Sequence, residues 1–454
     1  KKHSQPRKNL CRYLMQTKFT KKQLEDPEIK NTEDILRKCV HCGMCNATCP
    51  TFQVLGDELD GPRGRIYLIK DMIENNKAPT EKVVKHIDRC LSCYACMTTC
   101  PSGVNYMHII DHGRNHIERN YKRPFLDRLL RNMLSYVLPR PNIFLLLSWL
   151  TKITKPLLFF MPRKIKNMVA LMPINFPKAQ HKAKNVFKPE GKTVARVILL
   201  TGCVQKVISP QINDSTINIL NRHGVEVHVS QEVSCCGSLN HHLGKEKLAH
   251  NSFIQNINAW TKISETNPID AIIVNTSGCG TTLKDYGFIF QNHPDTNLRK
   301  KAKQVSKLAK DVTEYLGKNI KLNFIKNEKS YKIAYHSACS MQHGQKVHQQ
   351  PIDLLKNSGN TILEIPDGHL CCGSAGTYNL LQEKMASELL KRKVENIDKI
   401  KPDFISAGNI GCITQIATGS SIPIVHTIEL LDWFTGGIKP KQIEKEYNEK
   451  NISN

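Results

Sequence analysis

Two stretches of the chain carry the same arrangement of cysteines: CVHCGMCNATCP at positions 39–50 and CLSCYACMTTCP at positions 90–101. In each, two residues separate the first three cysteines from one another, a fourth follows after three more residues, and proline comes directly after it. Three thiolates within seven residues can surround one metal centre. The fourth points away, because the proline turns the chain out of the loop. Such clustered spacing in a long chain indicates metal binding in a reducing compartment.

The spacing is the one found in bacterial iron–sulfur proteins with two clusters, in which the fourth cysteine of each run binds the cluster of the other run. Zinc sites are built differently, from paired Cys-x-x-Cys with a loop between the pairs. We therefore predict two [4Fe–4S] clusters. The segment between the runs carries Ile66, Ile69 and Ile73 near helical spacing, which favours a helical ferredoxin domain. The predicted ligand sets are Cys39, Cys42, Cys45 and Cys100 for cluster 1, and Cys90, Cys93, Cys96 and Cys49 for cluster 2.

A second pattern of cysteines is duplicated later in the chain. Cys203 and Cys235 are 32 positions apart, as are Cys339 and Cys371, and both copies continue as Cys-Cys-Gly-Ser. Short β-branched strands, among them Val225–Val229 and Ala271–Val274, alternate with helical stretches around them, which predicts a parallel α/β unit present twice, with a linking helix at Lys300–Leu316 between the copies. The cysteines follow strand ends, where open α/β sheets place ligands. The tentative metal-binding residues are Cys203, Cys235, Cys236, Cys279, Cys339, Cys371, Cys372 and Cys412. An additional iron–sulfur centre, zinc, a redox disulfide and a vestigial site all remain open for them.

Composition and charge set broad limits on the molecule. The 454 residues predict two or three domains. The 65 basic and 40 acidic residues give a formal charge of +25, which attracts anionic partners without specifying one. The first residues show no signal-peptide pattern, and the longest apolar run, Ile143–Leu150, is far shorter than the roughly 20 residues of a spanning helix. We expect a cytoplasmic protein, with peripheral contact at the inner face of the cell membrane as an option.

The order of these patterns predicts a multidomain chain, with a helical two-[4Fe–4S] ferredoxin domain before a duplicated α/β domain. The segment 124–177 mixes apolar and basic residues. We expect it to pack against a partner subunit or the chain's own domains, with an amphipathic membrane anchor as the alternative. The predicted segments are a flexible lead-in (1–30), the ferredoxin domain (31–120), a helical connector (121–190), two α/β repeats (191–325 and 326–438) and a tail (439–454).

Several stretches together resemble the CCG-domain family, and in particular the iron–sulfur subunits of bacterial glycolate oxidases. They are Leu59–Lys70, Thr99–Val104, Gly202–Gln205, Cys371–Leu380 and Gly408–Cys412. The likeness runs from about residue 30 to 435. The full CCG pattern ends in Cys-x-x-Cys, whereas Gly280-Thr281-Thr282 follows Cys279 and Ile413-Thr414-Gln415 follows Cys412. Each site here thus has four cysteines and not five.

The resemblance implies an electron-transfer subunit of a complex that oxidises glycolate to glyoxylate. It implies an FAD-binding flavoprotein partner and a quinone or other electron acceptor. D-Lactate and glycerol 3-phosphate are the alternative substrates, and a redox-sensing binding protein is an alternative of another class. We find no dinucleotide or phosphate-loop motif, no catalytic residues and no nucleic-acid-binding motif in the sequence.

Five other positions receive weaker predictions. Arg63 and Arg65 lie between the two cysteine runs, where they could donate hydrogen bonds near a cluster, dock a partner or simply begin a helix. His336 and the pair His241-His242 are interpreted as ordinary core or surface histidines.

Overall fold

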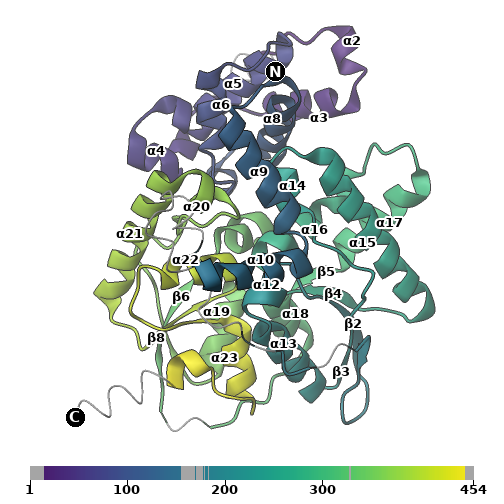
Figure 1. Cartoon of the computed structure of the whole chain (residues 1–454), viewed down its shortest axis with the longest axis vertical. Helices are drawn as coiled ribbons and strands as arrows, with labels where there is room; N and C mark the ends of the chain where they lie inside the picture. The colour runs from purple at the N-terminus through teal and green to yellow at the C-terminus, as the bar shows by residue number, and fades with distance from the viewer. Residues whose placement is uncertain are drawn as a thin grey trace, which may run out of the picture. The chain divides into compact units, whose positions relative to one another are not determined.

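The computed structural model describes residues 15–154, 169, 177, 179–181, 184–326 and 329–444. The chain folds into two compact units, whose helices and strands are labelled in Figure 1. Unit 1 contains the described residues through Leu129 together with Asn240–Glu246, and unit 2 contains Leu130–Leu239 and the described residues from Lys247 onward. Seven residues of the first α/β repeat therefore belong to the unit that carries the N-terminal cysteine runs.

Unit 1 is built from short helices. Their starts are encoded locally, because Asp26 accepts a hydrogen bond from the Glu28 amide with Pro27 in the first turn, and Thr80 caps a later helix in the same way. The elements are α2 (Lys21–Leu24), α3 (Pro27–Leu36), η1 (Met44–Asn46), α4 (Pro50–Leu55), η2 (Glu58–Asp60), α5 (Pro62–Glu74), α6 (Glu81–Asp88), α7 (Ala95–Thr99) and α8 (Tyr106–Asn120).

The core of unit 1 lies beside the cysteines. Ile66, Ile69 and Ile73 of α5 are buried there, as the helical spacing predicts. Helices α2 and α3 lie where the composition predicts a flexible lead-in, and Met15 is 2% exposed with its amide hydrogen-bonded to the carbonyl of Cys39. Residues 15–30 thus include two capped helices, with Met15 buried in this core and Phe19 and Ile29 half-buried against it. The first 14 residues lie outside the described part.

One glycine fixes how α5 approaches the cysteine loops. A Cβ atom on Gly64 would lie 2.1 Å from the carbonyl oxygen of Glu58, so only glycine allows η2 to pack on the first turn of α5. This contact sets the position of Arg63 and Arg65 on either side of it.

Unit 2 contains two mostly parallel sheets of equivalent topology. The first has the order β1-β3-β2-β4-β5, with β1 antiparallel, and the second has the order β7-β6-β8-β9, all parallel. The strands are β1 (Val186–Phe187), β2 (Ala195–Leu200), β3 (Val225–His228), β4 (Ala271–Val274), β5 (Ala309–Asp311), β6 (Lys332–His336), β7 (Thr361–Leu363), β8 (Phe404–Ala407) and β9 (Ile424–His426).

Helices cover both faces of each sheet, as the continuous apolar runs of buried parallel strands require. They are α12 (Gln205–Ile208), α13 (Gln211–Arg222), α15 (Glu246–Thr266), α16 (Ser277–Ile289), α17 (Thr296–Leu308), α18 (Val312–Asn319), η4 (Ser340–Gln345), α19 (Gln349–Asn357), α20 (Tyr378–Leu381), α21 (Glu383–Ile400), α22 (Ile410–Ala417) and α23 (Thr427–Phe434). Figure 1 shows α15 and α17 on one outer side of this unit and α21 on the other.

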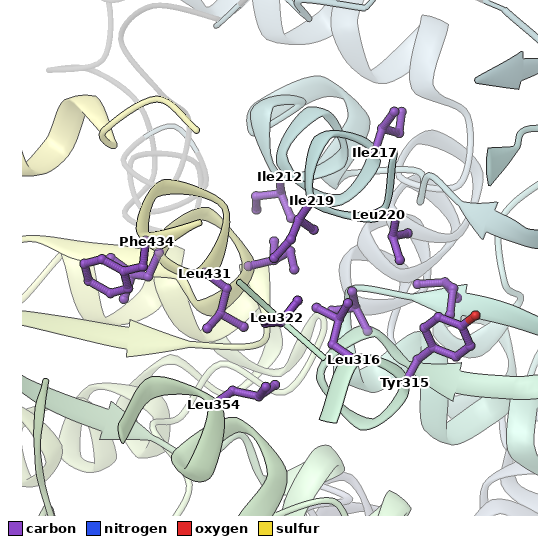
Figure 2. Close-up of a cluster of buried hydrophobic side chains, with 14 of the residues drawn as sticks. Ile212, Ile217, Ile219, Leu220, Tyr315, Leu316, Leu322, Leu354, Leu431 and Phe434 are labelled. Carbon is purple, nitrogen blue, oxygen red and sulfur yellow. The ribbon is translucent and has the colours of Figure 1, made fainter. Parts of the chain in front are cut away.

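The two repeats share one hydrophobic core. Helix α13 packs against α23, and α19 packs against α18, so each repeat contributes to both contacts. Figure 2 shows Ile212 and Ile219 of α13 close to Leu431 of α23, with Leu316 and Leu354 from the other pair below them. Because the core is continuous, the two repeats form one folding unit.

Helix α9 (Phe125–Val137) contains the last residues of unit 1 before Leu130, and α10 (Pro141–Thr154) follows it in the chain. Helix α14 (Ser238–His242) follows the first Cys-Cys pair. The second apolar run of the predicted connector, 157–161, lies outside the described residues, as does most of the predicted tail. Within the described ranges no helix is both long and apolar enough to cross a membrane.

Candidate metal centres

The structure gathers one group of four cysteines, set 1, from both N-terminal runs. Burial raises the pKa of the Cys39 thiol, and the neighbouring thiolates of Cys100 and Cys42 raise it further. Burial also raises the pKa of Cys45 to about 11, with added repulsion from Cys39 and Cys100. All four line one cavity. Set 1 therefore takes three cysteines from the first run and one from the second.

The second group, set 2, has the reciprocal composition. Burial raises the pKa of Cys96, and the largest further contributions come from the thiolates of Cys93, Cys90 and Cys49 in that order. The hydroxyls of Thr48 and Thr99 hydrogen-bond at 3.1 Å and connect the ends of the two runs. The structure thus brings the cysteines together in the two predicted sets of four, and the ligand roles of the individual cysteines remain a prediction.

The donors around these sulfur atoms fit anionic thiolates. The backbone amide of Ser92 donates to Cys90 Sγ at 3.5 Å, and the amide of Val104 donates to Cys100 Sγ at 3.4 Å. Hydrogen bonds to the charged form stabilise it, whereas four buried thiolates without a cation repel one another. Two groups of four thiols with amide donors, the first around a cavity that Cys96 of the second also lines, fit two four-iron clusters.

Set 2 has a buried cation beside it. Arg65 is 1% exposed, and its guanidinium donates to Cys49 Sγ at 3.8 Å and to the hydroxyl of Thr51 at 3.0 Å. Burial opposes its charge, but the thiolates of Cys90 and Cys49 and the phenol of Tyr106 raise the Arg65 pKa above its usual range. Arg65 is therefore placed to donate to a sulfur of set 2, as one of the three weaker predictions suggested.

A buried carboxylate holds Arg65 in place. Asp60 is fully buried and lies 3.5 Å from Arg65, 3.0 Å from His86 Nδ1 and 2.7 Å from Arg89. The ligand atoms of Asp57, Asp60 and His86 lie within 4.8 Å of one another, as in a metal site. Two guanidinium groups already contact Asp60, however, and we assign the cluster to an ion-pair network. Sequence analysis did not find it, although Asp60 lies in the same short stretch as Arg65.

Set 1 is more open than set 2. Cys42 is exposed, whereas Cys49, Cys90 and Cys96 are all buried. Arg63 lies beside it, donating to the carbonyl of His41 at 3.0 Å and to Glu58 at 2.6 Å. The two sets therefore differ in their access to solvent and to partners.

In unit 2 the first repeat gathers its cysteines into set 3: Cys203, Cys235, Cys236 and Cys279. Cys203 follows strand β2, the adjacent pair lies in the loop after β3, and Cys279 is in the first turn of α16. The Sγ atoms of Cys203 and Cys235 are 3.5 Å apart, and those of Cys236 and Cys279 are 3.0 Å apart. Hydrogen bonding to Cys235 and burial raise the pKa of Cys203.

The second repeat gathers set 4 in the equivalent positions: Cys339, Cys371, Cys372 and Cys412. Contacts with the thiols of Cys339 and Cys372 raise the pKa of Cys371, and Asn409 donates to Cys412 Sγ at 3.3 Å. All four cysteines are buried. The structure therefore brings the eight tentative residues together as two sets of four, one in each repeat.

The other predicted histidines have structural partners. His241 and His242 of α14 lie 3.3 Å and 3.1 Å from the two carboxylate oxygens of Asp111 in α8. The charges of these histidines outweigh burial and lower the pKa of Asp111. These contacts bind the segment Asn240–Glu246 into unit 1, so the pair has a structural role.

Comparison with known proteins identifies both kinds of domain. A family model described as a 4Fe-4S dicluster domain matches residues 35–104, and one described as a cysteine-rich domain, the CCG family, matches residues 197–284 and again 333–417. These matches confirm the predicted order of a two-cluster ferredoxin domain before a duplicated α/β domain. They also confirm 4Fe–4S clusters as cofactors.

Two relatives are similar over nearly their whole length. The chain is 40% identical over 419 residues to the glycolate oxidase iron–sulfur subunit of Escherichia coli (strain K12), covering 92% of this chain and 98% of that protein. It is 29% identical to the probable glycolate oxidase iron–sulfur subunit of Bacillus subtilis (strain 168), with the same coverage of both. A lactate utilization protein A from Geobacillus sp. (strain WCH70) is 24% identical over 52% of this chain and 99% of its own length.

Proposed function

Because the chain belongs to the family of glycolate oxidase iron–sulfur subunits, we propose that it serves a complex that oxidises glycolate to glyoxylate. It is an electron-transfer subunit of an oxidoreductase. A separate FAD-binding flavoprotein takes two electrons and two protons from glycolate. This chain receives the electrons and passes them to a quinone or another acceptor.

The observation that supports the proposal is the pairing of two thiol sets from interleaved runs. A cluster bound at each set takes up and releases one electron at a time. The thiol of Cys45 in set 1 is close enough to raise the pKa of Cys96 in set 2, so the sets are neighbours. Exposed Cys42 makes set 1 the entry or exit point, and buried set 2 with Arg65 the interior step.

Substrate bleaching tests this proposal. We would purify the native complex anaerobically and offer glycolate, D-lactate and glycerol 3-phosphate separately while following the visible absorbance of the clusters. We expect glycolate to bleach it faster than the other two. Faster bleaching by D-lactate would instead favour the activity in the name of the lactate utilization relatives. If dithionite bleaches the clusters and none of the three substrates does, the proposal is wrong.

The eight cysteines of sets 3 and 4 belong to the proposal as metal ligands. Each set contains an adjacent Cys-Cys pair before a glycine, Gly237 or Gly373, with φ of +79° and +89°. Only glycine adopts this backbone readily, and the turn directs both thiols to one side. Iron clearly above the roughly eight atoms of two cubanes, or zinc beside them, is the expected result of metal analysis.

Contact with a membrane surface is the last part of the proposal. Phe125, Leu126 and Leu129 of α9 are 66%, 75% and 54% exposed, and Arg128 beside them is also exposed. An apolar face flanked by cations suits an anionic membrane surface. We expect the complex to co-sediment with vesicles containing anionic lipid, and Leu126→Glu with Leu129→Glu to abolish this. Equal sedimentation of the double variant would contradict the role of α9.

A further inference from the structure

The two metal sites of unit 2 differ at one position in the sheet. Strand β2 ends at Leu200 and strand β6 at His336, each three residues before the first cysteine of its set. The two residues are therefore equivalent in the duplicated topology. One repeat places an apolar side chain beside the thiols, and the other places an imidazole.

His336 has no hydrogen bond of ordinary geometry that would explain its burial. It is 1% exposed, neither ring nitrogen makes such a hydrogen bond to any residue that the structure describes, and its side chain interacts instead with the thiol of Cys372. An unsatisfied buried polar group costs about 1–3 kcal/mol. By contrast His426, buried to the same extent in the same repeat, has its Nε2 2.9 Å from the carbonyl oxygen of Asn275. The fold thus satisfies a buried histidine where it serves structure alone.

The imidazole faces the thiols of set 4. A ring nitrogen of His336 and the Sγ atoms of Cys372 and Cys412 all lie within 4.8 Å of one another, and all three residues are buried. This spacing suits ligands around a common ion, because metal–sulfur and metal–nitrogen bonds are about 2.0–2.3 Å long. A neutral imidazole also adds a ligand without adding negative charge.

A buried cation distinguishes set 4 in the same way. Lys393 of α21 is 2% exposed and donates to the carbonyl oxygen of Asp367 at 3.2 Å; burial disfavours its charge, whereas the thiolates of Cys339, Cys372 and Cys371 favour it. A Cβ on Gly373 would contact the carbonyl of Ala386, and one on Gly237 the carbonyl of Ala249, which aligns α21 with α15. Asn256 of α15 is then the counterpart of Lys393. A buried ammonium group beside thiolates compensates an anionic metal–thiolate centre.

We propose that His336 is a metal ligand, and that it completes with set 4 a mixed thiolate–imidazole centre that the first repeat lacks. This inference rests on the proposal that the repeat cysteines bind metal, and adds a ligand and an asymmetry to it. Thiolate and imidazole together suit zinc and iron. Set 3, with Leu200 in place of the histidine, offers thiolates alone.

The test is His336→Leu, which installs the residue that the first repeat carries at this position. We would measure iron, zinc and acid-labile sulfide per chain in the anaerobically purified complex. His348→Leu is the matched control, because it makes the same change at an exposed histidine of the same repeat. We expect at least a several-fold loss of metal from the second site in His336→Leu alone. The roughly eight ferredoxin irons should stay in both variants.

Two further measurements decide the role of the side chain. His336→Cys supplies another ligand, so it should keep metal that His336→Leu loses. For iron, protein labelled with ¹⁵N-histidine should show a nitrogen coupled to the paramagnetic centre, and for zinc, X-ray absorption should show a nitrogen neighbour, each lost in His336→Leu. The inference is wrong if His336→Leu keeps the metal and the signal, or if the parent complex holds no metal beyond its ferredoxin clusters.

These results are independent of the substrate. If glycolate fails to bleach the ferredoxin clusters while His336→Leu loses metal, the proposed function falls and the ligand assignment stands. If glycolate bleaches them and His336→Leu keeps its metal, the proposed function stands and the ligand assignment falls.

Discussion

Replacing Cys100 with serine should remove the cluster bound by the first cysteine run, although Cys100 belongs to the second. The reason is the composition of set 1, in which the Cys100 thiolate acts on both Cys39 and Cys45. The iron held by the two ferredoxin clusters should fall from about eight to about four atoms per chain, since one cubane holds four irons. Cys49→Ser should cause the same loss of iron from the other set.

Double variants separate crossed from uncrossed ligation. With crossed ligands, Cys42→Ser with Cys100→Ser damages one ferredoxin cluster only, so about four of the ferredoxin irons remain. Cys42→Ser with Cys49→Ser damages both ferredoxin clusters and leaves almost none of their iron. The electron paramagnetic resonance spectrum of the reduced protein should show a remaining ferredoxin cluster in the first pair and none in the second. The opposite pattern would show that each run binds its own cluster.

The sequence predicts the cysteine sets well because their geometry is local. Three ligands fall within seven residues, and the fourth follows from the reciprocal motif. The duplicated spacing of 32 residues likewise predicts two equivalent α/β units, which the matches to the cysteine-rich family confirm. The strands Val225–His228 and Ala271–Val274 lie where their β-branched runs predict them.

The strands that the sequence does not reveal are short and at the sheet edges. Strand β5 interrupts a stripe that predicts one helix over 300–316, because its three residues, Ala309–Asp311, pair in parallel with β4. Three residues are too few for apolar and polar side chains to show the alternation of a strand. The apolar residues of α17 and α18 also keep the helical spacing across β5, so the sequence predicts one continuous helix. Strands β1 and β9 are missed for the same reason.

Partners that meet only in the folded chain are also beyond sequence reasoning. Asp60 and Arg89 are 29 residues apart, and nothing in either local pattern indicates a buried pair. From its strand position His336 is interpreted as an ordinary core histidine, and only its place beside Cys372 and Cys412 in the folded chain distinguishes it. Buried polar networks are settled by tertiary packing, which local periodicity does not encode.

Replacing Arg65 with methionine should both destabilise unit 1 and lower the reduction potential of the cluster at set 2. In this variant the fully buried Asp60 loses one of its two guanidinium partners and keeps only His86 and Arg89. Breaking a buried ion pair by removing one partner costs about 3–5 kcal/mol. Reduction adds negative charge to the cluster, and the positive guanidinium beside Cys49 favours that form.

The potential should therefore fall, by an amount we expect to be near 60 mV, or tenfold in the one-electron equilibrium. A redox titration followed by electron paramagnetic resonance measures the potential, and thermal unfolding measures the stability. Arg65→Lys keeps the charge but loses the forked donor, so it should recover part of the potential and less of the stability.

Arg63→Met is the matched control, because its side chain is 33% exposed and pairs with the exposed Glu58. An exposed ion pair contributes about 0–1 kcal/mol, so this variant should unfold close to the parent. The set 2 potential should be nearly unchanged in it, since Arg63 acts on Cys45 of set 1. Equal shifts in both arginine variants would mean that total charge, and not the buried contact to Cys49, sets the potential. A potential unchanged in Arg65→Met despite lost stability would limit Arg65 to holding Asp60 in the fold.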